Sequence, residues 1–192
     1  MYVRKGTPAD LPAIMNIIKN AQAYLAAQGI DQWQDGYPND EAFLKDMENG
    51  YCRVAVEEAE NGETVLGVSA FIPTGEPDYA VIHDGAWLND GRYMTVHRVA
   101  VDSTLRRKGI ASFLLAAAVE EAKELDLSSL RLDTHMENVV MQATLLRNGL
   151  TKCGTIILGR ANVSDPTGLP DGPVTPDMVP AKFLRWGYEK LI

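Results

Sequence analysis

Three cations and one glycine directly precede a long apolar run in the stretch STLRRKGIASFLLAAAVEEA, residues 103–122. Arg106, Arg107 and Lys108 supply positive charge, and Gly109 allows the backbone to approach a ligand closely. A helix that begins here exposes unpaired N–H groups and the positive end of its dipole, which together bind phosphate. The stretch therefore indicates a phosphate or pyrophosphate site. The alternative is a plain strand–helix turn whose cations face water.

The spacing of the glycines excludes two common phosphate-binding motifs. A dinucleotide fingerprint needs two further glycines, and a P-loop needs Gly-Lys-Ser or Gly-Lys-Thr after a longer loop; the stretch has neither. The net charge of −8 also argues against nonspecific binding of nucleic acid, whose phosphates most of the surface would repel. We expect a small-molecule partner, and cationic small molecules suit the charge best.

Hydrophobic periodicity and turn residues predict the elements that hold this stretch in place. Helices are predicted over residues 7–29, 39–50, 110–125 and 138–149, and strands over residues 51–59, 64–72, 92–101, 129–135 and 151–159. Residues 79–82 are a candidate for a further strand, and Asn61-Gly62 predicts a hairpin. This order predicts an α/β fold of the α+β type, with a central mixed, mostly antiparallel sheet flanked by helices.

The length and composition predict a single domain over residues 1–192, since 46% hydrophobic residues suit one buried core. Residues 159–180 are rich in proline and glycine and predict a long loop, which is either functional or a surface excursion. No run reaches the ~18 apolar residues of a membrane helix. The first residues also lack the apolar core of a signal peptide, so we expect a cytosolic protein without a membrane partner.

The signature and its neighbours resemble a known family. Arg106-Arg107-Lys108-Gly109-Ile110-Ala111 matches the Gln/Arg-x-x-Gly-x-Gly/Ala signature of the GCN5-related N-acetyltransferases, the GNAT family. The predicted elements on both sides follow the order of that family, so the resemblance implies the acyl-CoA N-acyltransferase fold. It covers most of the chain, is strongest over residues 97–154, and is weakest over residues 30–50 and 159–180.

The resemblance implies acetyl-CoA as cosubstrate and assigns residues to it. The signature loop and first helical turn would grip the pyrophosphate through backbone amides: Arg106, Arg107, Lys108, Gly109, Ile110, Ala111 and Ser112. Val99 and Val101, on the strand before the loop, would lend backbone groups to the pantetheine arm. Asn138, after the following strand, matches an asparagine that contacts the cofactor. These assignments agree with the need of a buried amide-rich arm for backbone partners.

One position departs from the family pattern. The family helix commonly reads Asn-x-x-Ala-x-x-x-Tyr-x-x-x-Gly-Phe, and its tyrosine protonates the departing CoA thiolate. The matching residues here are Asn138, Met141, Leu145, Gly149 and Leu150. The usual general acid is therefore missing at Leu145. A thiolate is a good leaving group, so another group or water could protonate it, with a loss of about 10²–10⁴-fold in rate if no donor replaces the tyrosine.

Three residues are candidates for the general base that removes a proton from the attacking amine. Strand alternation predicts that His97 shares a face with Val99 and Val101. Asp133 and His135 share a face of the next strand, close to where the two strands should separate. Histidine has the intrinsic pKa that this task needs. The alternative for both histidines is a hydrogen-bonded structural role in the core.

The acceptor pocket is less clearly marked. Residues 29–38 combine Trp33 and Tyr37 with Asp31 and Asp35, which would suit a cationic amine. The alternative is a loop held in place because its two aromatic rings pack on the core. In this family the two N-terminal helices, which the loop joins, commonly border the substrate cleft.

Five other residues are weighed between chemistry and structure. Trp87 and Tyr188 face the same choice between pocket and core. Arg98, between apolar neighbours, is predicted to be a structural ion-pair partner. Cys52 and Cys153 lie far apart without metal or redox spacing, which predicts inert buried thiols.

The sequence predicts an N-acetyltransferase that moves an acetyl group from acetyl-CoA to a primary amine of a small molecule or peptide by direct attack. No metal is implied, because the histidines lack ligand spacing. The first alternative is an acyl-CoA-binding or sensing module of the same fold with weak catalysis. The second is another acyl group or acceptor, such as a protein N-terminus. Family members often pair, so a homodimer is a further expectation.

Overall fold

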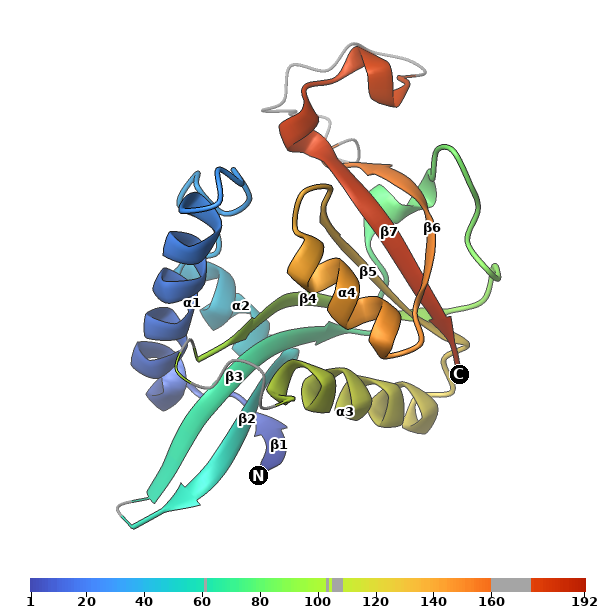
Figure 1. The fold of residues 1–192 in the computed structure, drawn as a ribbon. Helices are drawn as coiled ribbons and strands as arrows, with labels where there is room; N and C mark the ends of the chain where they lie inside the picture. The colour runs from blue at the N-terminus through green and yellow to red at the C-terminus, as the bar shows by residue number, and fades with distance from the viewer. Residues whose placement is uncertain (61, 103, 105–108, 160–173) are drawn as a thin grey trace.

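A computed structural model of the chain describes residues 1–60, 62–102, 104, 109–159 and 174–192. Its centre is a seven-stranded sheet in the order β1-β2-β3-β4-β5-β7-β6 (Figure 1). The strands are β1 (Tyr2–Lys5), β2 (Cys52–Ala59), β3 (Gly62–Ile72), β4 (Tyr93–Val101), β5 (Ser129–His135), β6 (Thr151–Ile157) and β7 (Leu184–Leu191). Among these strands only β4 and β5 pair in parallel. The predicted mixed, mostly antiparallel sheet is confirmed.

Helices cover the sheet and begin where the sequence places caps. They are α1 (Leu11–Ala26), α2 (Asp40–Glu48), α3 (Ile110–Glu124) and α4 (Val139–Arg147). A single 3-10 turn at Pro8–Asp10 precedes α1, and Thr7 with Asp10 forms a capping box there. The side chain of Asn39 accepts a hydrogen bond from the Ala42 N–H at 3.0 Å and caps α2. Within the described part of the chain, none of the helices has the length and hydropathy needed to span a bilayer.

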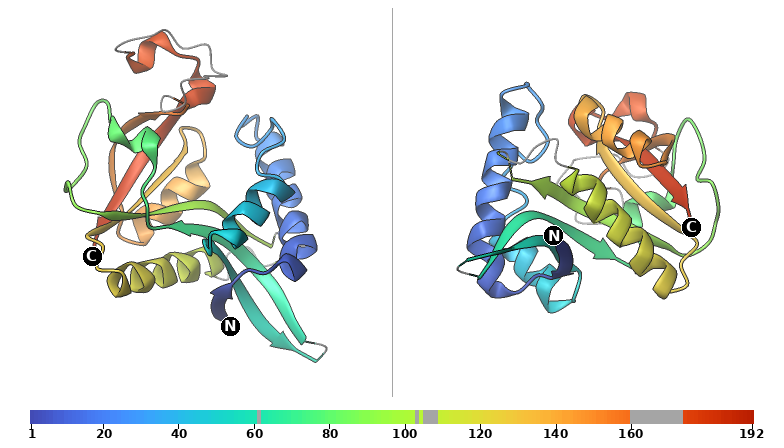
Figure 2. Two further views of the ribbon diagram at one scale, coloured as in Figure 1. Left: turned by 180° about the vertical axis from the view of Figure 1, so that it is seen from behind. Right: turned by 60° about the horizontal axis from the view of Figure 1, so that its bottom comes forward.

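The helices lie on both faces of the sheet, as the two further views show (Figure 2). Helices α1 and α2 pack on β2, β3 and the end of β4 through Ile14, Ile17, Ile18, Phe43, Val54, Val56, Val68 and Ala100. Helices α3 and α4 pack on the other face through Met94, Val96, Leu115, Ala118, Leu130, Leu132 and Leu145. The sheet is therefore a buried layer whose middle strands, β4 and β5, are enclosed from both sides.

The parallel pair β4 and β5 separates partway along its length. Tyr93 to Thr95 pair with Ser129 to Arg131, and no later residues of the two strands pair in the described structure. Beyond Thr95, β4 remains paired with β3 alone. Backbone groups of β4 therefore face a gap on the β5 side, which supports the separation that the sequence predicted.

A β-bulge distorts β4 where the two strands separate. The register with β3 shifts between Val68 and Ala70, which pair with Ala100 and His97 respectively. Two residues of β4, Arg98 and Val99, thus stand where β3 has one. Arg98 adopts a left-handed backbone conformation with φ 57°, which side chains other than glycine rarely adopt. The extra residue changes the direction in which the following side chains point.

Three segments differ from their prediction or were not assigned, and a fourth is described only in part. Strand β1 was not predicted, and the closing segment forms β7, which inserts between β5 and β6. Residues 79–82 do not form a strand, because Pro77 begins a 3-10 helix over Pro77–Ala80. The predicted loop at 159–180 falls mostly outside the described residues, and its end contains a 3-10 turn at Pro176–Met178.

Candidate active site

The bulge in β4 decides which side chains face the α1 and α2 side of the sheet. Val96 and Val99 pack in the core beneath α3, and Val101 packs in an adjoining cluster on the same face. His97 and Arg98 instead form ion pairs on the opposite face. The prediction that His97 shares a face with Val99 and Val101 is wrong, because the extra residue interrupts strand alternation.

His97 lies between two carboxylates. Its Nε2 is 3.0 Å from Glu76 Oε2, and its Nδ1 is 3.9 Å from Asp133 Oδ1. The imidazole is 20% exposed, so a small ligand can reach it. Burial raises the pKa of Glu76, but the hydrogen bond and charge of His97 outweigh burial and leave that pKa lower than usual. Glu76 is therefore an anionic partner of His97 at neutral pH.

Tyr79 supports Asp133 from beneath the site. Its hydroxyl donates to Asp133 Oδ1 at 2.6 Å, and its ring centre lies 6.1 Å from that of His97. The side chain is fully buried, and burial together with the Asp133 charge raises the pKa of Tyr79 well above its usual value. The phenol therefore stays neutral and remains a hydrogen-bond donor that fixes the Asp133 carboxylate.

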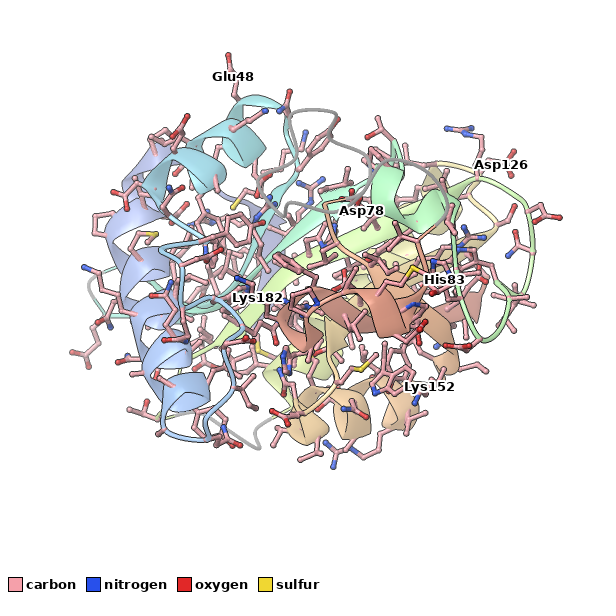
Figure 3. All side chains as sticks on the ribbon, turned by 90° about the horizontal axis from the view of Figure 1, so that it is seen from above. Glu48, Asp78, His83, Asp126, Lys152 and Lys182 are labelled. Atoms are coloured by element: carbon pink, nitrogen blue, oxygen red, sulfur yellow. The ribbon has the colours of Figure 1, made fainter. Side chains whose placement is uncertain are left out.

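Glu76 and Tyr79 were missed in the sequence because no periodicity marks them. Both belong to residues 73–92, which connect β3 to β4. His83, labelled in Figure 3, pairs with Thr155 of β6 through backbone hydrogen bonds of 2.9 and 2.7 Å. This pairing holds the connection against β6. The 54-residue separation of Tyr79 from Asp133 left no local signal.

His135 lies on the same face of β5 as Asp133, as predicted, but both of its ring nitrogens are occupied. Its Nε2 is 3.0 Å from Asp31 Oδ1, and its Nδ1 accepts the Glu137 N–H at 3.2 Å. Burial first, and then the charge of Arg185, lower the pKa of His135. The imidazole is suited to joining the 29–38 loop to β5, and it has no free nitrogen to accept a proton.

The helix that follows the basic turn presents an open N-terminus. Arg106, Arg107 and Lys108 lie outside the described residues. Gly109 has φ 79°, and no side chain of the described residues caps the first turn of α3. A Cβ built on Gly109 would meet no atom of these residues within 4 Å, so open space adjoins the start of the helix, where the first N–H groups lack helical partners. This is the geometry that an anion needs.

The remaining residues of that first turn have distinct surroundings. Ile110 is 3% exposed and packs its side chain into the core, which leaves only its backbone available. Ala111 is half-buried, and Ser112 Oγ accepts a hydrogen bond from Asn148 Nδ2 at 2.9 Å. Asn148 follows α4 directly, so this bond joins the end of α4 to the start of α3.

Asn138 stands at the N-terminus of α4 on the β5 side of the opening. Its Oδ1 accepts the Met141 N–H at 3.1 Å, and its Nδ2 donates to Gln32 Oε1 at 3.2 Å. The same side chain thus caps α4 and contacts the 29–38 loop. Together with the His135 contact to Asp31, this bond joins the two sides of the molecule next to the opening.

The residues that replace or resemble a catalytic tyrosine lie in the core. Leu145, on the inner face of α4, is completely buried and carries no proton to donate. Tyr188 is 1% exposed, and its hydroxyl lies 3.5 Å from Gln142 Oε1. Trp87 donates from its indole to the Tyr79 carbonyl at 2.9 Å. The structure therefore places Tyr188 in the packed interior, whereas Trp87 is half-buried and bound within the 73–92 connection.

The aromatic and acidic side chains of the 29–38 loop have partners of their own. Trp33 packs against the cluster of α1 and α2, and Tyr37 lies with its ring centre 5.4 Å from the Arg98 guanidinium carbon. Asp35 Oδ1 accepts the Tyr37 N–H at 3.2 Å, while Asp31 contacts His135. These contacts hold the loop beside the site.

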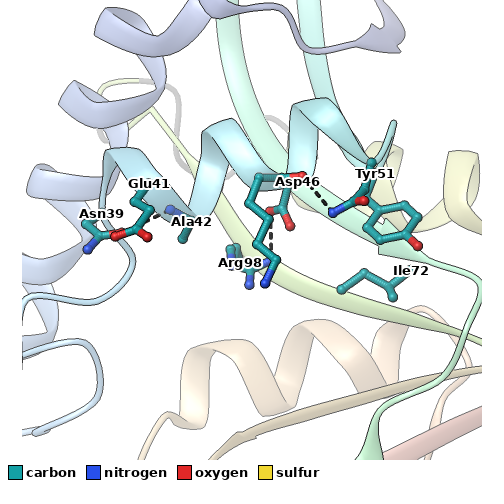
Figure 4. A pocket seen from close by; sticks show the side chains of 9 residues that line it. Asn39, Glu41, Ala42, Asp46, Tyr51, Ile72 and Arg98 are labelled. Atoms are coloured by element: carbon teal, nitrogen blue, oxygen red, sulfur yellow. Dashed lines mark hydrogen bonds and ion pairs between the residues drawn. The ribbon is translucent and has the colours of Figure 1, made fainter.

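A cavity of about 370 Å³ adjoins the bulge (Figure 4). Helix α2 forms one wall and Arg98 projects from β4 in the middle. The lining residues are Asn39, Glu41, Ala42, Lys45, Asp46, Asn49, Tyr51, Ile72 and Arg98. Arg98 Nη1 donates to Asp46 Oδ2 at 2.7 Å, so the predicted ion-pair role of Arg98 is confirmed. Burial raises the pKa of Asp46 despite this partner.

Both cysteines are buried, as predicted. Burial raises the pKa of Cys52 to about 12 and also raises that of Cys153. Neither thiol is therefore a nucleophile at neutral pH. Among the described residues, no three His, Cys, Asp or Glu side chains converge in a way that could hold a metal ion.

Several solved structures that are similar to this chain are described as acetyltransferases. A GNAT-family acetyltransferase from Streptococcus agalactiae is 32% identical, covers 99% of this chain and 94% of its own, and superposes with a TM-score of 0.78. A GNAT-family acetyltransferase from Listeria monocytogenes is 18% identical with a TM-score of 0.65, covering 99% and 94% of the two chains. A ribosomal-protein-alanine N-acetyltransferase from Brucella melitensis is 22% identical with a TM-score of 0.61, covering 100% of both.

The family model described as acetyltransferase (GNAT) family matches residues 18–150. No curated protein sequence matches the chain. The matched range includes the opening between β4 and β5, the start of α3 and all of α4. The chain belongs to the GNAT family of acetyltransferases, whose general reaction is acyl transfer.

Proposed function

We propose that this protein transfers an acetyl group from acetyl-CoA to a primary amine by direct attack, without a covalent enzyme intermediate. The observation that carries the proposal is the position of His97, held by Glu76 at the opening between β4 and β5. Family membership supports acyl transfer. The choice of an acetyl group and an amine rests on the signature beside Gly109 and on a base suited to an amine.

The residues around the opening fit acetyl-CoA. The free amides from Gly109 to Ser112 would hold its pyrophosphate, with positive charge from Arg106, Arg107 and Lys108. The unpaired edge of β4 near Val99 and Val101 would hold the pantetheine arm, with Asn138 on the opposite side. The bound cofactor supplies an activated thioester. The empty space at Gly109 supports this assignment.

His97 is the proposed general base. When its Nε2–H donates to Glu76, its Nδ1 keeps a lone pair that faces the gap toward Asp133. The Asp133 carboxylate attracts the protonated amine, Nδ1 takes one proton from it, and Glu76 stabilises the resulting imidazolium. In this proposal Asp133 is a binding group for the amine and His135 is a structural residue. His97 is then the one remaining candidate for the general base.

The thiolate that departs takes its proton from water or from the amine nitrogen as the tetrahedral intermediate collapses. Leu145 leaves no tyrosine in the usual position. A thiol has a pKa near 8.5, so a thiolate departs without full protonation. This makes turnover slower than with an acid in place, by up to about 10²–10⁴-fold.

A binding or sensing role is the second candidate, because the buried Leu145 removes a proton donor while the cofactor opening remains. Such a protein would bind acetyl-CoA and CoA but release little CoA with any amine.

We further propose one domain over residues 1–192, since β1 to β7 join in one sheet, and a cytosolic location.

Calorimetric titration with acetyl-CoA, CoA and ATP tests the cofactor assignment, and CoA release with a panel of amines tests catalysis. The proposal expects saturable binding of acetyl-CoA and CoA, much weaker binding of ATP, and amine-dependent CoA release. Binding without release by any amine would favour the sensing role. Absence of binding to both CoA forms would overturn the acetyltransferase proposal.

A further inference from the structure

Arg98 has hydrogen-bond donors that its surroundings do not use. A guanidinium carries five N–H donors in a planar fork. Arg98 Nη1 donates to Asp46, whereas Arg98 Nε is buried and has no hydrogen-bond partner among the described residues. A buried donor without a partner is costly. The Tyr37 ring also contacts the guanidinium, with its centre 5.4 Å from the guanidinium carbon, yet the ion pair and this ring contact leave the buried Nε without a partner in the described part of the chain.

The backbone of Arg98 is also held in a disfavoured conformation. Its φ of 57° lies in the left-handed region, and it forms the bulge opposite β3. The bulge places the Arg98 and His97 side chains on the same face, next to each other along the chain. The pKa of Asp46 is raised by burial, and the charges of Arg98 and His97 only partly oppose that rise. Strain of this kind concentrates where a side chain must be aimed at a ligand.

The charges around the cavity leave Arg98 available to an anion. Asp46 is 7% exposed at its side chain and is bound to Arg98 from the helix side. Lys45, one residue earlier on α2, is exposed and lines the same cavity. Glu41 lines the same cavity nearer the start of α2, beside Asn39 (Figure 4). The volume of about 370 Å³ suits a small molecule.

We propose that the acceptor amine carries an anionic oxygen group, a carboxylate or a phosphate, which Arg98 and Lys45 bind in this cavity while the amino group lies at His97. This inference rests on the proposed acetyl transfer and defines its substrate class. The planar fork of arginine matches the paired oxygens of such groups. Amino acids and aminoalkyl phosphates belong to this class, whereas polyamines and simple alkylamines do not.

Matched pairs of amines test the substrate class. The panel contains L-amino acids, their amides and the amines that lack the carboxylate, together with phosphoethanolamine and ethanolamine. With acetyl-CoA saturating, kcat/KM from CoA release should favour the best anionic acceptor over its uncharged counterpart by about 10- to 100-fold, as expected for a charge-assisted hydrogen bond. The amino acids test for recognition of a carboxylate, and phosphoethanolamine tests for recognition of a phosphate.

Variants of Arg98 assign the preference to this residue. Arg98→Gln should raise KM for the anionic acceptor by about 10- to 100-fold, with little effect on its uncharged counterpart. Because this change leaves Asp46 buried without its partner, Arg98→Lys and the double variant Arg98→Gln/Asp46→Asn are measured beside it. Arg98→Lys keeps the charge but lacks the fork. Arg92→Gln, at the start of the same strand, is the control with an equal loss of charge.

The outcomes separate this inference from the proposed function. Equal or better turnover of the uncharged amines, or an Arg98 variant that keeps the full preference, would overturn the inference and leave acetyl transfer standing. Acetyl-CoA binding without turnover of any panel member would overturn it as well. Loss of acetyl-CoA binding itself would overturn the proposed function and with it this inference.

Discussion

Two polar clusters lie on the same face of β4 and β5, one where the strands are paired and one where they separate. At the paired end, Arg131 Nε is 2.9 Å from Glu189 Oε1, with side chains 6% and 0% exposed. Glu189 also accepts hydrogen bonds from the Leu88 N–H, Asn89 and Ser129. The guanidinium carbon of Arg131 lies 4.4 Å from the ring centre of Trp87 and 4.0 Å from that of Tyr93. We call this group the saturated cluster, because Arg131 and Glu189 are each bound by several partners.

At the open end the charged groups keep unused capacity. His97 Nδ1 is 3.9 Å from its second carboxylate, and Arg98 Nε is buried without a partner in the part of the chain that the structure describes. Both side chains border solvent-accessible space. The contrast teaches that burial and charge do not by themselves mark a functional site. What distinguishes the open cluster is that its donors and acceptors are incompletely satisfied.

The largest expected effect is a loss of folding stability when the saturated cluster is disrupted. Glu189→Gln leaves the Arg131 charge buried without compensation and should lower the free energy of unfolding by about 3–5 kcal/mol, measured by urea denaturation. Glu120→Gln is the control, because its ion pair with Lys123 is 68% and 52% exposed. It should change stability by less than about 1 kcal/mol. Equal losses in the two variants would contradict the distinction between a structural and an open cluster.

A methyl group at Gly109 should affect ligand binding more than folding. Gly109→Ala places a Cβ in the open space at the start of α3 and should weaken acetyl-CoA binding by about 10- to 100-fold, measured by calorimetry. Gly29→Ala is a matched control, since Gly29 has φ 74°, close to the 79° of Gly109, and no atom within 4 Å of an added Cβ. Both changes carry similar backbone strain. Equal acetyl-CoA affinity in the two variants would show that Gly109 does not adjoin the cofactor.

Tyr79 connects the two clusters, because its hydroxyl binds Asp133 and its ring contacts Trp87 and Tyr93. Tyr79→Phe keeps the ring and removes the hydroxyl. It should lower the free energy of unfolding by about 1–2 kcal/mol and reduce kcat/KM about 10-fold as Asp133 loses its fixed position. Unchanged kcat/KM with lowered stability would place Tyr79 and Asp133 in the structural cluster alone.

The smallest effect is a pH dependence at Glu76. Its folded-state pKa is lowered by His97, so it stabilises the folded protein above the unfolded pKa of Glu, and this contribution is lost as pH falls through the folded value. Wild type should therefore exceed Glu76→Gln in stability at neutral pH, and the difference should shrink below about pH 4. Denaturation at several pH values measures this difference. A stability difference that does not change with pH would show that the charge of Glu76 does not stabilise the folded protein.

Local rules predicted much of the fold. Capping residues and apolar stripes predicted all four helices, and the strands β2 to β6 follow runs of apolar residues bounded by turns. Strand β7 was not assigned because its position between β5 and β6 depends on partners far along the chain. The basic turn before Gly109 was recognisable because its pattern is contiguous.

The other side of the site could not be predicted in the same way. Strand alternation placed His97 correctly on β4 but on the wrong face, because nothing in the sequence announces the extra residue at Arg98. Glu76 and Tyr79 reach the site through a connection without periodicity. A bulge and a long connection are set by tertiary packing, which local patterns do not report.

The central claim is that the open cluster performs acid–base chemistry through His97. The most direct test compares the pH dependence of kcat/KM for wild type and His97→Gln, with saturating acetyl-CoA and the best amine of the panel. We predict a loss of about 100-fold or more at neutral pH, a flattened acidic limb and unchanged acetyl-CoA affinity. The same rate and the same profile in both proteins would contradict the claim and return His97 to a structural role.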